Sequence, residues 1–252
     1  MKNRKHWIGI AILSGAVIFT ACNENGLPEV TDDLASIEKN AESATAEPGD
    51  SCVYGEPGSC CAYDGVLTDA DIEGIMEMRE EEKLARDVYL YFYEMYDHIV
   101  FKNISKSEEA HTSAVLRIIG GYELIDPATE EVGVFTNPLF TELYSQLTEQ
   151  GSASLTEALK VGAFIEEYDI NDLNGLIEET ENADLERVYS NLLRGSTFHL
   201  RAFSRILDRM GESYTPVVIT EEYYNELLNT ELSDDEDGVA DDPDWECPYL
   251  DS

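Results

Sequence analysis

The chain has 252 residues, of which 53 are acidic and 16 are basic, giving a formal net charge of -37. This charge repels nucleic acid and the anionic face of a bilayer, so nucleic-acid binding is excluded and cations are the natural partners. The length suits one good-sized core with tails rather than two full domains.

The N-terminal stretch MKNRKHWIGIAILSGAVIFTAC has a basic start and an apolar run that is short for a membrane span and ends at small residues. These are the features of a secretory signal. The FTAC ending resembles the lipobox of bacterial lipoproteins, although Phe19 replaces the usual leucine. The resemblance implies a signal peptide at residues 1–21, acylation of Cys22 and, because Asn23 follows, a lipid anchor at the outer membrane or cell surface. Simple cleavage of the signal is the alternative.

Residues 22–65 are polar and lack a periodic apolar pattern, which predicts a tether. The chain has four further cysteines, which in an exported protein are expected to form disulfides rather than to bind metal: Cys52, Cys60, Cys61 and Cys247. Neighbouring cysteines rarely bond to each other, so Cys60 and Cys61 are expected to pair with the other two, in an order that the sequence leaves open.

A 3.6-residue apolar period begins at Thr68, which caps a helix together with Asp71, and continues to about Tyr96. It predicts a long first helix. A second helix follows over about residues 100–119 and stops at the glycine pair 120–121. The short link between these helices predicts that they are antiparallel neighbours.

The segment 120–153 has turn signals and a short helix, LFTELYSQLTEQ, which starts at Asn137 and Pro138. A third long helix begins at a capping box of Ser154 and Glu157, and a fourth runs from Asn182 to Gly211. Only the VGVF stretch at 132–135 is ambiguous with a strand.

These elements predict an all-α fold: a four-helix bundle at residues 66–211, with a long crossover between helices two and three as in ferritin-type connectivity. Irregular tails flank the bundle, and the C-terminal one covers residues 212–252.

Steps of three and four residues define the stripe of each long helix that faces the bundle axis. These stripes are apolar except for a few polar residues, at least one on each helix: Glu82, then Glu108 and His111, then Glu166, then Ser196 and His199. On the third helix Glu167 falls on the opposite, polar side.

Burying an unpaired carboxylate costs roughly several kcal/mol, so three converging acids require compensating positive charge. A metal ion supplies it. Glu108 and His111 lie one turn apart and point at the same ion, and carboxylates with imidazole suit iron or manganese, with zinc as an alternative. In the competing interpretation each acid is partly exposed or paired with an arginine, such as Arg86 or Arg194.

Two helical segments carry a resemblance to known proteins. FKNISKSEEAH resembles the metal-binding helix F-x-x-I-[AS]-x-[AS]-E-x-x-H of rubrerythrin-type ferritin-like proteins, and EEKLARDVYLYF resembles their first metal-binding helix. Residues 72–210, with phrases such as GVFTNP, QGSASLTEAL and YSNLLRGSTFHLRAF, are similar to a prokaryotic family of ferritin-like proteins catalogued as domain of unknown function 2202.

The ferritin-like pattern implies a glutamate on helices one and three and E-x-x-H on helices two and four. The matching residues are Glu82, Glu108, His111, Glu166 and His199. The fourth-helix glutamate is missing, and Ser196 stands in its place, with Asp169 as a candidate replacement. A symmetric pair of metals and one strong position beside a weakened one both remain open. Arg86 is a candidate partner of the ligands, and Tyr89 is a candidate donor or a core residue.

The acidic stretch DDEDGVADDPDWECP resembles the calcium-binding repeats of thrombospondin type 3, with one extra residue before the cysteine. Alternating carboxylates around Gly238 can supply several oxygens to one Ca²⁺. The candidate ligands are Asp235, Asp237, Asp241 and Asp244. A disordered acidic tail is the alternative.

The sequence therefore favours a lipid-anchored cell-envelope metalloprotein with a non-haem iron or iron–manganese centre that acts on oxygen, peroxide or ferrous iron. No Cys₄ electron-transfer module accompanies the bundle, which argues against a complete rubrerythrin peroxidase. The rival is a non-catalytic surface lipoprotein whose bundle is a structural or binding module with a calcium-binding tail. Whether the chain forms a homodimer is left open.

Overall fold

The computed structural model describes residue 63 and residues 65–230, and every regular element within them is an α-helix. The helices are α2 (Asp69–Tyr96), α3 (Ile99–Gly121), α4 (Pro138–Gly151), α5 (Leu155–Glu179), α6 (Ala183–Arg209) and α7 (Glu221–Asn229). The prediction of an all-α fold is confirmed, and VGVF is not a strand. The signal, Cys22, the four other cysteines and the candidate calcium ligands lie outside the described residues.

Local sequence signals set the start of each long helix. The Thr68 side chain accepts a hydrogen bond from the Asp71 backbone N–H, and the Asp71 carboxylate accepts one from the Thr68 N–H, which completes a capping box. Asn137 caps α4 ahead of Pro138, Ser154 caps α5, and Asn182 caps α6. The helix starts that the sequence predicts are therefore found within a residue or two of the expected positions.

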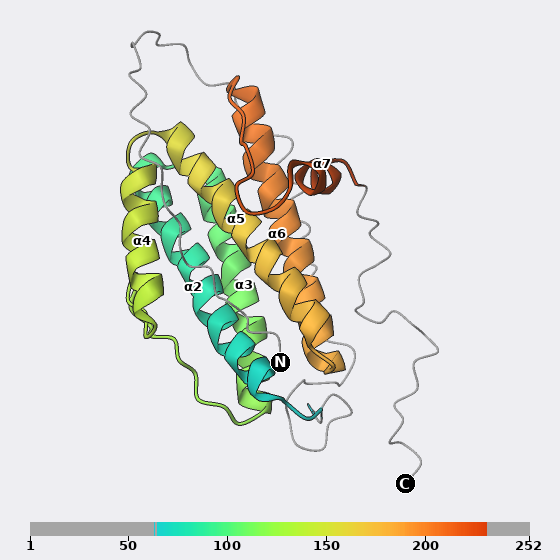
Figure 1. Cartoon of the computed structure of the whole chain (residues 1–252). Helices are drawn as coiled ribbons and strands as arrows, with labels where there is room; N and C mark the ends of the chain where they lie inside the picture. The colour runs from blue at the N-terminus through green and yellow to red at the C-terminus, as the bar shows by residue number, and fades with distance from the viewer. Residues whose placement is uncertain (1–62, 64, 231–252) are drawn as a thin grey trace, which may run out of the picture. The chain divides into compact units, whose positions relative to one another are not determined.

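The four long helices form a bundle (Figure 1). α2 packs along α3, and α5 packs along α6, because only residues 97–98 and 180–182 link the members of each pair. α2 also contacts α5, and α3 contacts α6, which closes the bundle. The crossover from α3 to α5 carries α4, which lies against α2 and α5 on the outside.

The apolar core is divided in two along the bundle. One cluster contains Tyr89, Phe92, Phe101 and Phe203, and the other contains Ile75, Val115, Leu173 and Leu192. In each long helix the polar residues of the inward stripe fall between the residues of these two clusters. A buried polar layer therefore crosses the bundle between two apolar regions.

Residues 212–230, which the sequence assigns to the acidic tail, fold against the bundle. α7 contacts α6, and Arg201 donates to the carbonyls of Leu227 and Thr230 at the C-terminal end of α7. Glu167 is fully buried and accepts hydrogen bonds from the backbone N–H groups of residues 217–219 and from the Tyr214 hydroxyl. The polar side of the third helix, on which the sequence pattern placed Glu167, is thus covered by the C-terminal segment.

No helix in the described part of the chain is both long enough and apolar enough to cross a membrane.

Candidate metal centre

Each of the four long helices contributes at least one buried polar side chain to the layer between the two apolar clusters. Glu82 comes from α2, Glu108 and His111 from α3, Glu166 and Asp169 from α5, and Ser196 and His199 from α6. The exposed fraction is 1–2% for the three glutamates, 4% for His199 and 9% for Asp169. The polar residues that the sequence places on the inward stripes are therefore buried, except that the His111 side chain is 12% exposed.

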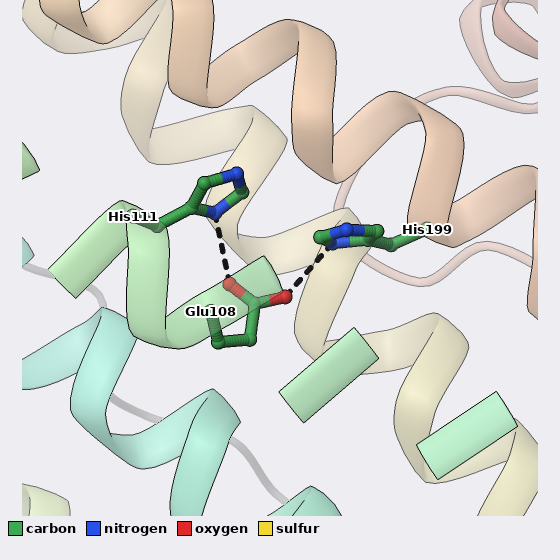
Figure 2. A group of neighbouring side chains, drawn as sticks. All are labelled: Glu108, His111 and His199. Carbon is green, nitrogen blue, oxygen red and sulfur yellow. Dashed lines mark ion pairs between the residues drawn. The ribbon is translucent and has the colours of Figure 1, made fainter. Parts of the chain in front are cut away.

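The Glu108 carboxylate lies between the two imidazoles, with one oxygen towards each ring (Figure 2). Its Oε2 is 2.9 Å from His111 Nδ1, and its Oε1 is 2.8 Å from His199 Nδ1. The second pair is close but makes no hydrogen bond, and both of its atoms are fully buried without a hydrogen-bond partner. Buried polar atoms without partners are costly, so this geometry favours a ligand between them.

Each imidazole has a second carboxylate beside the same nitrogen. Glu82 Oε2 lies 3.2 Å from His111 Nδ1, and Glu166 Oε2 lies 3.4 Å from His199 Nδ1. Tyr89 donates its hydroxyl to Glu166 Oε1 at 2.5 Å. Each histidine Nδ1 is thus flanked by Glu108 and by one glutamate from α2 or α5.

Ser196 occupies the place on α6 where the ferritin-like pattern expects a glutamate. It is fully buried, and its hydroxyl donates a short hydrogen bond to Asp169 Oδ2. The other oxygen of Asp169, Oδ1, is buried without a hydrogen-bond partner. The structure therefore brings Asp169 of α5 beside the position of the missing acid.

The outer nitrogens of the two histidines have different surroundings. His199 Nε2 lies 2.9 Å from the Ser107 hydroxyl, a contact that fixes the ring orientation and leaves Nδ1 facing inward. His111 Nε2 packs against Gly195, where a Cβ atom would lie only 2.4 Å from the nitrogen. Glycine at this position is required for the close approach of the ring to α6.

Protonation compensates the buried charge in the metal-free protein. Burial alone would raise the pKa of Glu108, but the charges of His199 and His111 hold this pKa well below its usual range. Burial and the charge of Glu108 raise the pKa of Glu166 to about 7. Burial also raises the pKa of Asp169 to about 7, against the opposing hydrogen bond from Ser196.

The pKa values of the two histidines are raised, whereas burial of an isolated imidazole lowers its pKa. Burial lowers the pKa of His199, but the carboxylates of Glu108 and Glu166 dominate and raise it to about 10. Glu82 and Glu108 likewise raise the pKa of His111 well above its usual value against the effect of burial. In the metal-free protein, protons on the two histidines therefore supply the positive charge that offsets the buried carboxylates. A metal ion that binds here must displace these protons.

The donor set fits a transition metal. Glu108, His111 and His199 each offer one ligand atom, and these atoms all lie within 4.8 Å of one another. Buried carboxylates combined with neutral imidazole nitrogens suit iron, manganese or zinc. Glu82 Oε1, Glu108 Oε1, His199 Nδ1 and Asp169 Oδ1 are buried without a hydrogen bond and add donor capacity for a metal ion.

The structure does not place every predicted site residue at the centre. Arg86 donates two hydrogen bonds to Asp87, so the pairing of Arg86 with Glu82 that the sequence left open is not found. Tyr89 lies at the centre through Glu166. Ser107 and Gly195 contact the histidines, although nothing in the stripe pattern identifies them, since these contacts join different helices.

The fold and this site define a class of protein: an all-α helical bundle with a buried cluster of acids and histidines between two apolar regions. The chain belongs to the family described as an uncharacterized protein domain, DUF2202, whose profile matches residues 71–231. An uncharacterized protein of Methanocaldococcus jannaschii, MJ0754, is 47% identical over 165 residues, which cover 65% of this chain and 89% of that protein. The crystal structure of that hypothetical protein is similar, with a TM-score of 0.66 and 46% identity over 68% of this chain and 98% of the other.

Proposed function

We propose that this protein is a ferritin-like metalloprotein that holds a non-haem iron or iron–manganese centre in its helical bundle. The observation that carries the proposal is the single Glu108 carboxylate between two histidine Nδ1 atoms, with Glu108 Oε1 and His199 Nδ1 buried, 2.8 Å apart and not hydrogen-bonded. A cation between such donors offsets the cost of burying four carboxylates together.

The residues divide into two sets around Glu108. His111 and Glu82 would hold the metal on the α2/α3 side, and His199 and Glu166 on the α5/α6 side. Tyr89 orients Glu166 by its hydrogen bond, and Ser107 orients His199. The two apolar clusters exclude water from both ends of the layer and so strengthen the electrostatic interactions inside it.

A bound iron or iron–manganese centre would supply open coordination positions for oxygen, peroxide or ferrous iron. In the metal-free protein the pKa of Glu166 and of Asp169 is about 7, so metal binding by these carboxyls near neutral pH would release protons. The proposed activity is oxidation of ferrous iron or reduction of oxygen or peroxide.

Elemental analysis of protein purified from its native compartment tests the proposal. We expect iron, or iron with manganese, in the wild-type protein and less metal in the His111→Ala and His199→Ala variants. Oxygen and peroxide consumption by the loaded protein then assigns the reaction. Metal-free protein that stays metal-free after incubation with Fe²⁺ or Mn²⁺ would contradict the proposal and favour a structural or binding module.

The proposal also covers the N-terminus and the C-terminal tail, which lie outside the described residues. We propose that lipid on Cys22 anchors the protein at the cell envelope, and that Ca²⁺ orders the tail around Asp235, Asp237, Asp241 and Asp244. Membrane fractionation with mass spectrometry of the N-terminus tests the anchor. Calorimetry at millimolar calcium tests the tail, and free-thiol titration tests the proposed disulfides.

A further inference from the structure

The apolar clusters leave the sides of the bundle as the route by which a cation reaches the centre. One cluster fills the bundle on the Tyr89 side of the polar layer and the other on the Ile75 side, so the centre is closed along the axis. On the α3/α6 side the ring of His111 lies against Gly195. The α2/α3 and α5/α6 sides are closed by the extensive packing within each helix pair. On the α2/α5 side, α4 packs beside the cluster that contains Tyr89, to which its buried Phe140, Leu143 and Leu147 belong. The rest of this side carries three acids that the proposed centre does not use: Glu77, Glu81 and Asp172.

Four carboxylates follow the facing surfaces of α2 and α5. Glu77 and Glu81 lie one turn apart on α2, and Asp169 and Asp172 lie one turn apart on α5. Glu77, Glu81 and Asp172 are partly exposed, whereas Asp169 is 9% exposed. The four acids, here called the loading acids, therefore extend from the surface to the edge of the centre.

Glu81 joins the two helices within this group. Its carboxyl is hydrogen-bonded to Asp172, and the charges of Asp172, Asp169 and Glu77 all act on it. Its Oε2 is nevertheless fully buried without a hydrogen-bond partner. An oxygen in this position requires either a proton or a cation beside it.

Asp169 connects the loading acids to the centre. Its charge acts on Glu81 on one side and on Glu82 on the other. Oδ2 accepts from Ser196, while Oδ1 is buried and unpaired. This buried oxygen without a hydrogen bond is a second observation, independent of the three partly exposed acids, that points to a cation at this place.

We propose that Glu81 and Asp172 capture a divalent cation at the α2/α5 face and that Asp169 passes it to the centre. The inference deepens the proposed function and rests on it, because it assumes that the centre binds metal. Carboxylate oxygens at graded depth suit a hard or borderline divalent cation such as Fe²⁺, Mn²⁺ or Co²⁺.

The test compares Glu81→Gln with Glu94→Gln, which makes the same change of charge at an exposed position of α2. Metal-free protein is mixed with Co²⁺ in a stopped-flow instrument, and the rise of its visible absorption gives the rate of loading. The final stoichiometry is then measured by elemental analysis. We expect Glu81→Gln to slow loading about tenfold or more, because glutamine cannot release a proton to offer a carboxylate to the cation, while the final stoichiometry is unchanged. Glu94→Gln is expected to load like the wild type.

The other possible results distinguish failure of the loading route from failure of the proposed metal centre. Normal loading of Glu81→Gln beside a wild type that binds Co²⁺ would overturn the loading route alone. Loss of cobalt at equilibrium in Glu81→Gln would make Glu81 a resident ligand and also overturn the route. A wild type that takes up no Co²⁺, Mn²⁺ or Fe²⁺ would overturn both proposals.

Denaturation of the metal-free variants shows whether slow metal loading results only from lower stability of the fold. Burial and the charges of Asp172, Asp169 and Glu77 raise the pKa of Glu81 well above its usual value, so the neutral amide of Glu81→Gln replaces a carboxyl that favours its neutral form, and this variant is expected to be at least as stable as the wild type. Asp172→Asn provides a second variant with the same expected kinetics. A Glu81→Gln protein that loads slowly only because it is destabilised would count against the route.

Discussion

The two halves of the polar layer use the same contacts but not the same residues. On the α2/α3 side, His111 Nδ1 lies beside Glu82 and Glu108, and on the α5/α6 side His199 Nδ1 lies beside Glu166 and the same Glu108. α3 supplies the shared acid, while α6 has the neutral Ser196 in the corresponding place. The charged groups of the site therefore come from all four helices but are not arranged symmetrically.

The largest effect is expected from the residue that the two halves share. Glu108→Gln keeps the size of the side chain but removes the charge that faces both histidines. We expect metal affinity to fall by more than about 100-fold at both positions, because even partners outside the ligand shell are worth 10–100-fold. Isothermal titration with Mn²⁺ or Fe²⁺ measures the loss.

The matched control for this variant is Glu109→Gln, since Glu109 is the next residue on α3 and is exposed. Its affinity is expected to equal that of the wild type. Tight binding that survives in Glu108→Gln would mean that the halves do not depend on a shared acid.

The pKa values of Glu166, Asp169 and His199 predict how pH affects the stability of the metal-free protein. Glu166 and Asp169 have pKa values of about 7 in the folded protein, against ordinary values of 4.5 and 3.8. The folded state therefore binds more protons than the unfolded state between pH 4 and 7, and stability falls as pH rises through this window. His199, with its pKa raised from 6.5 to about 10, extends the fall to about pH 10.

Urea denaturation of chelator-treated protein at pH 5, 7 and 9 measures this dependence. We expect the free energy of unfolding to decrease from pH 5 to 9 by a total on the order of a few kcal/mol. Glu166→Gln should flatten the part between pH 5 and 7. A free energy of unfolding that increases from pH 5 to 9 would show that protons do not compensate the buried acids in this half.

Variants that lack one histidine test the two halves of the polar layer separately. His111→Ala removes a donor only from the α2/α3 side, and His199→Ala only from the α5/α6 side, since each imidazole faces its own glutamate. We expect each variant to lose about 100-fold or more in affinity at one position and to keep the other, because a lost ligand costs at least as much as a lost partner outside the ligand shell. Elemental analysis and titration of both variants provide the measurement, and unchanged stoichiometry in both would defeat the assignment.

The sequence predicts the bundle well because the signals involved are local. Caps such as Thr68 and Asn137 and the 3.6-residue period depend on a few neighbouring residues, and they fix where each helix starts and which stripe is buried. The buried acids and histidines follow from the same stripes. The sequence also indicates Asp169 as a candidate replacement for the missing glutamate, and in the structure Asp169 accepts a hydrogen bond from Ser196, which stands at that place.

Contacts between distant parts of the chain were not predictable in this way. Glu167 lies on the polar side of α5 in a helical projection, but residues 214–219 cover it and donate several hydrogen bonds to its carboxylate. The acidic composition of the C-terminal segment does not indicate α7 or its contact with Arg201. Likewise, Ser107 and Gly195 acquire their roles only when α3 and α6 come together.

The smallest expected effect concerns the asymmetry at Ser196. A glutamate here would give α6 its own acid beside His199, whereas serine contributes only a hydroxyl, which donates to Asp169. We therefore predict unequal metal positions, one tightly held and the other partly filled, unless Asp169 compensates. Ser196→Glu is expected to raise occupancy of the weaker position, and Asp169→Ala to lower it, by a few-fold to about tenfold.

Asp169→Asn tells whether charge or hydrogen bonding matters, because the amide oxygen can still accept from Ser196 while the negative charge is lost. If the charge of Asp169 replaces the missing acid, Asp169→Asn lowers occupancy of the weaker position as much as Asp169→Ala does. If Asp169 only holds Ser196 in place, Asp169→Asn keeps wild-type occupancy. Metal titration followed by elemental analysis distinguishes these results. Two equally tight metals in the native protein, insensitive to Asp169→Ala, would mean that the two halves are equivalent despite Ser196.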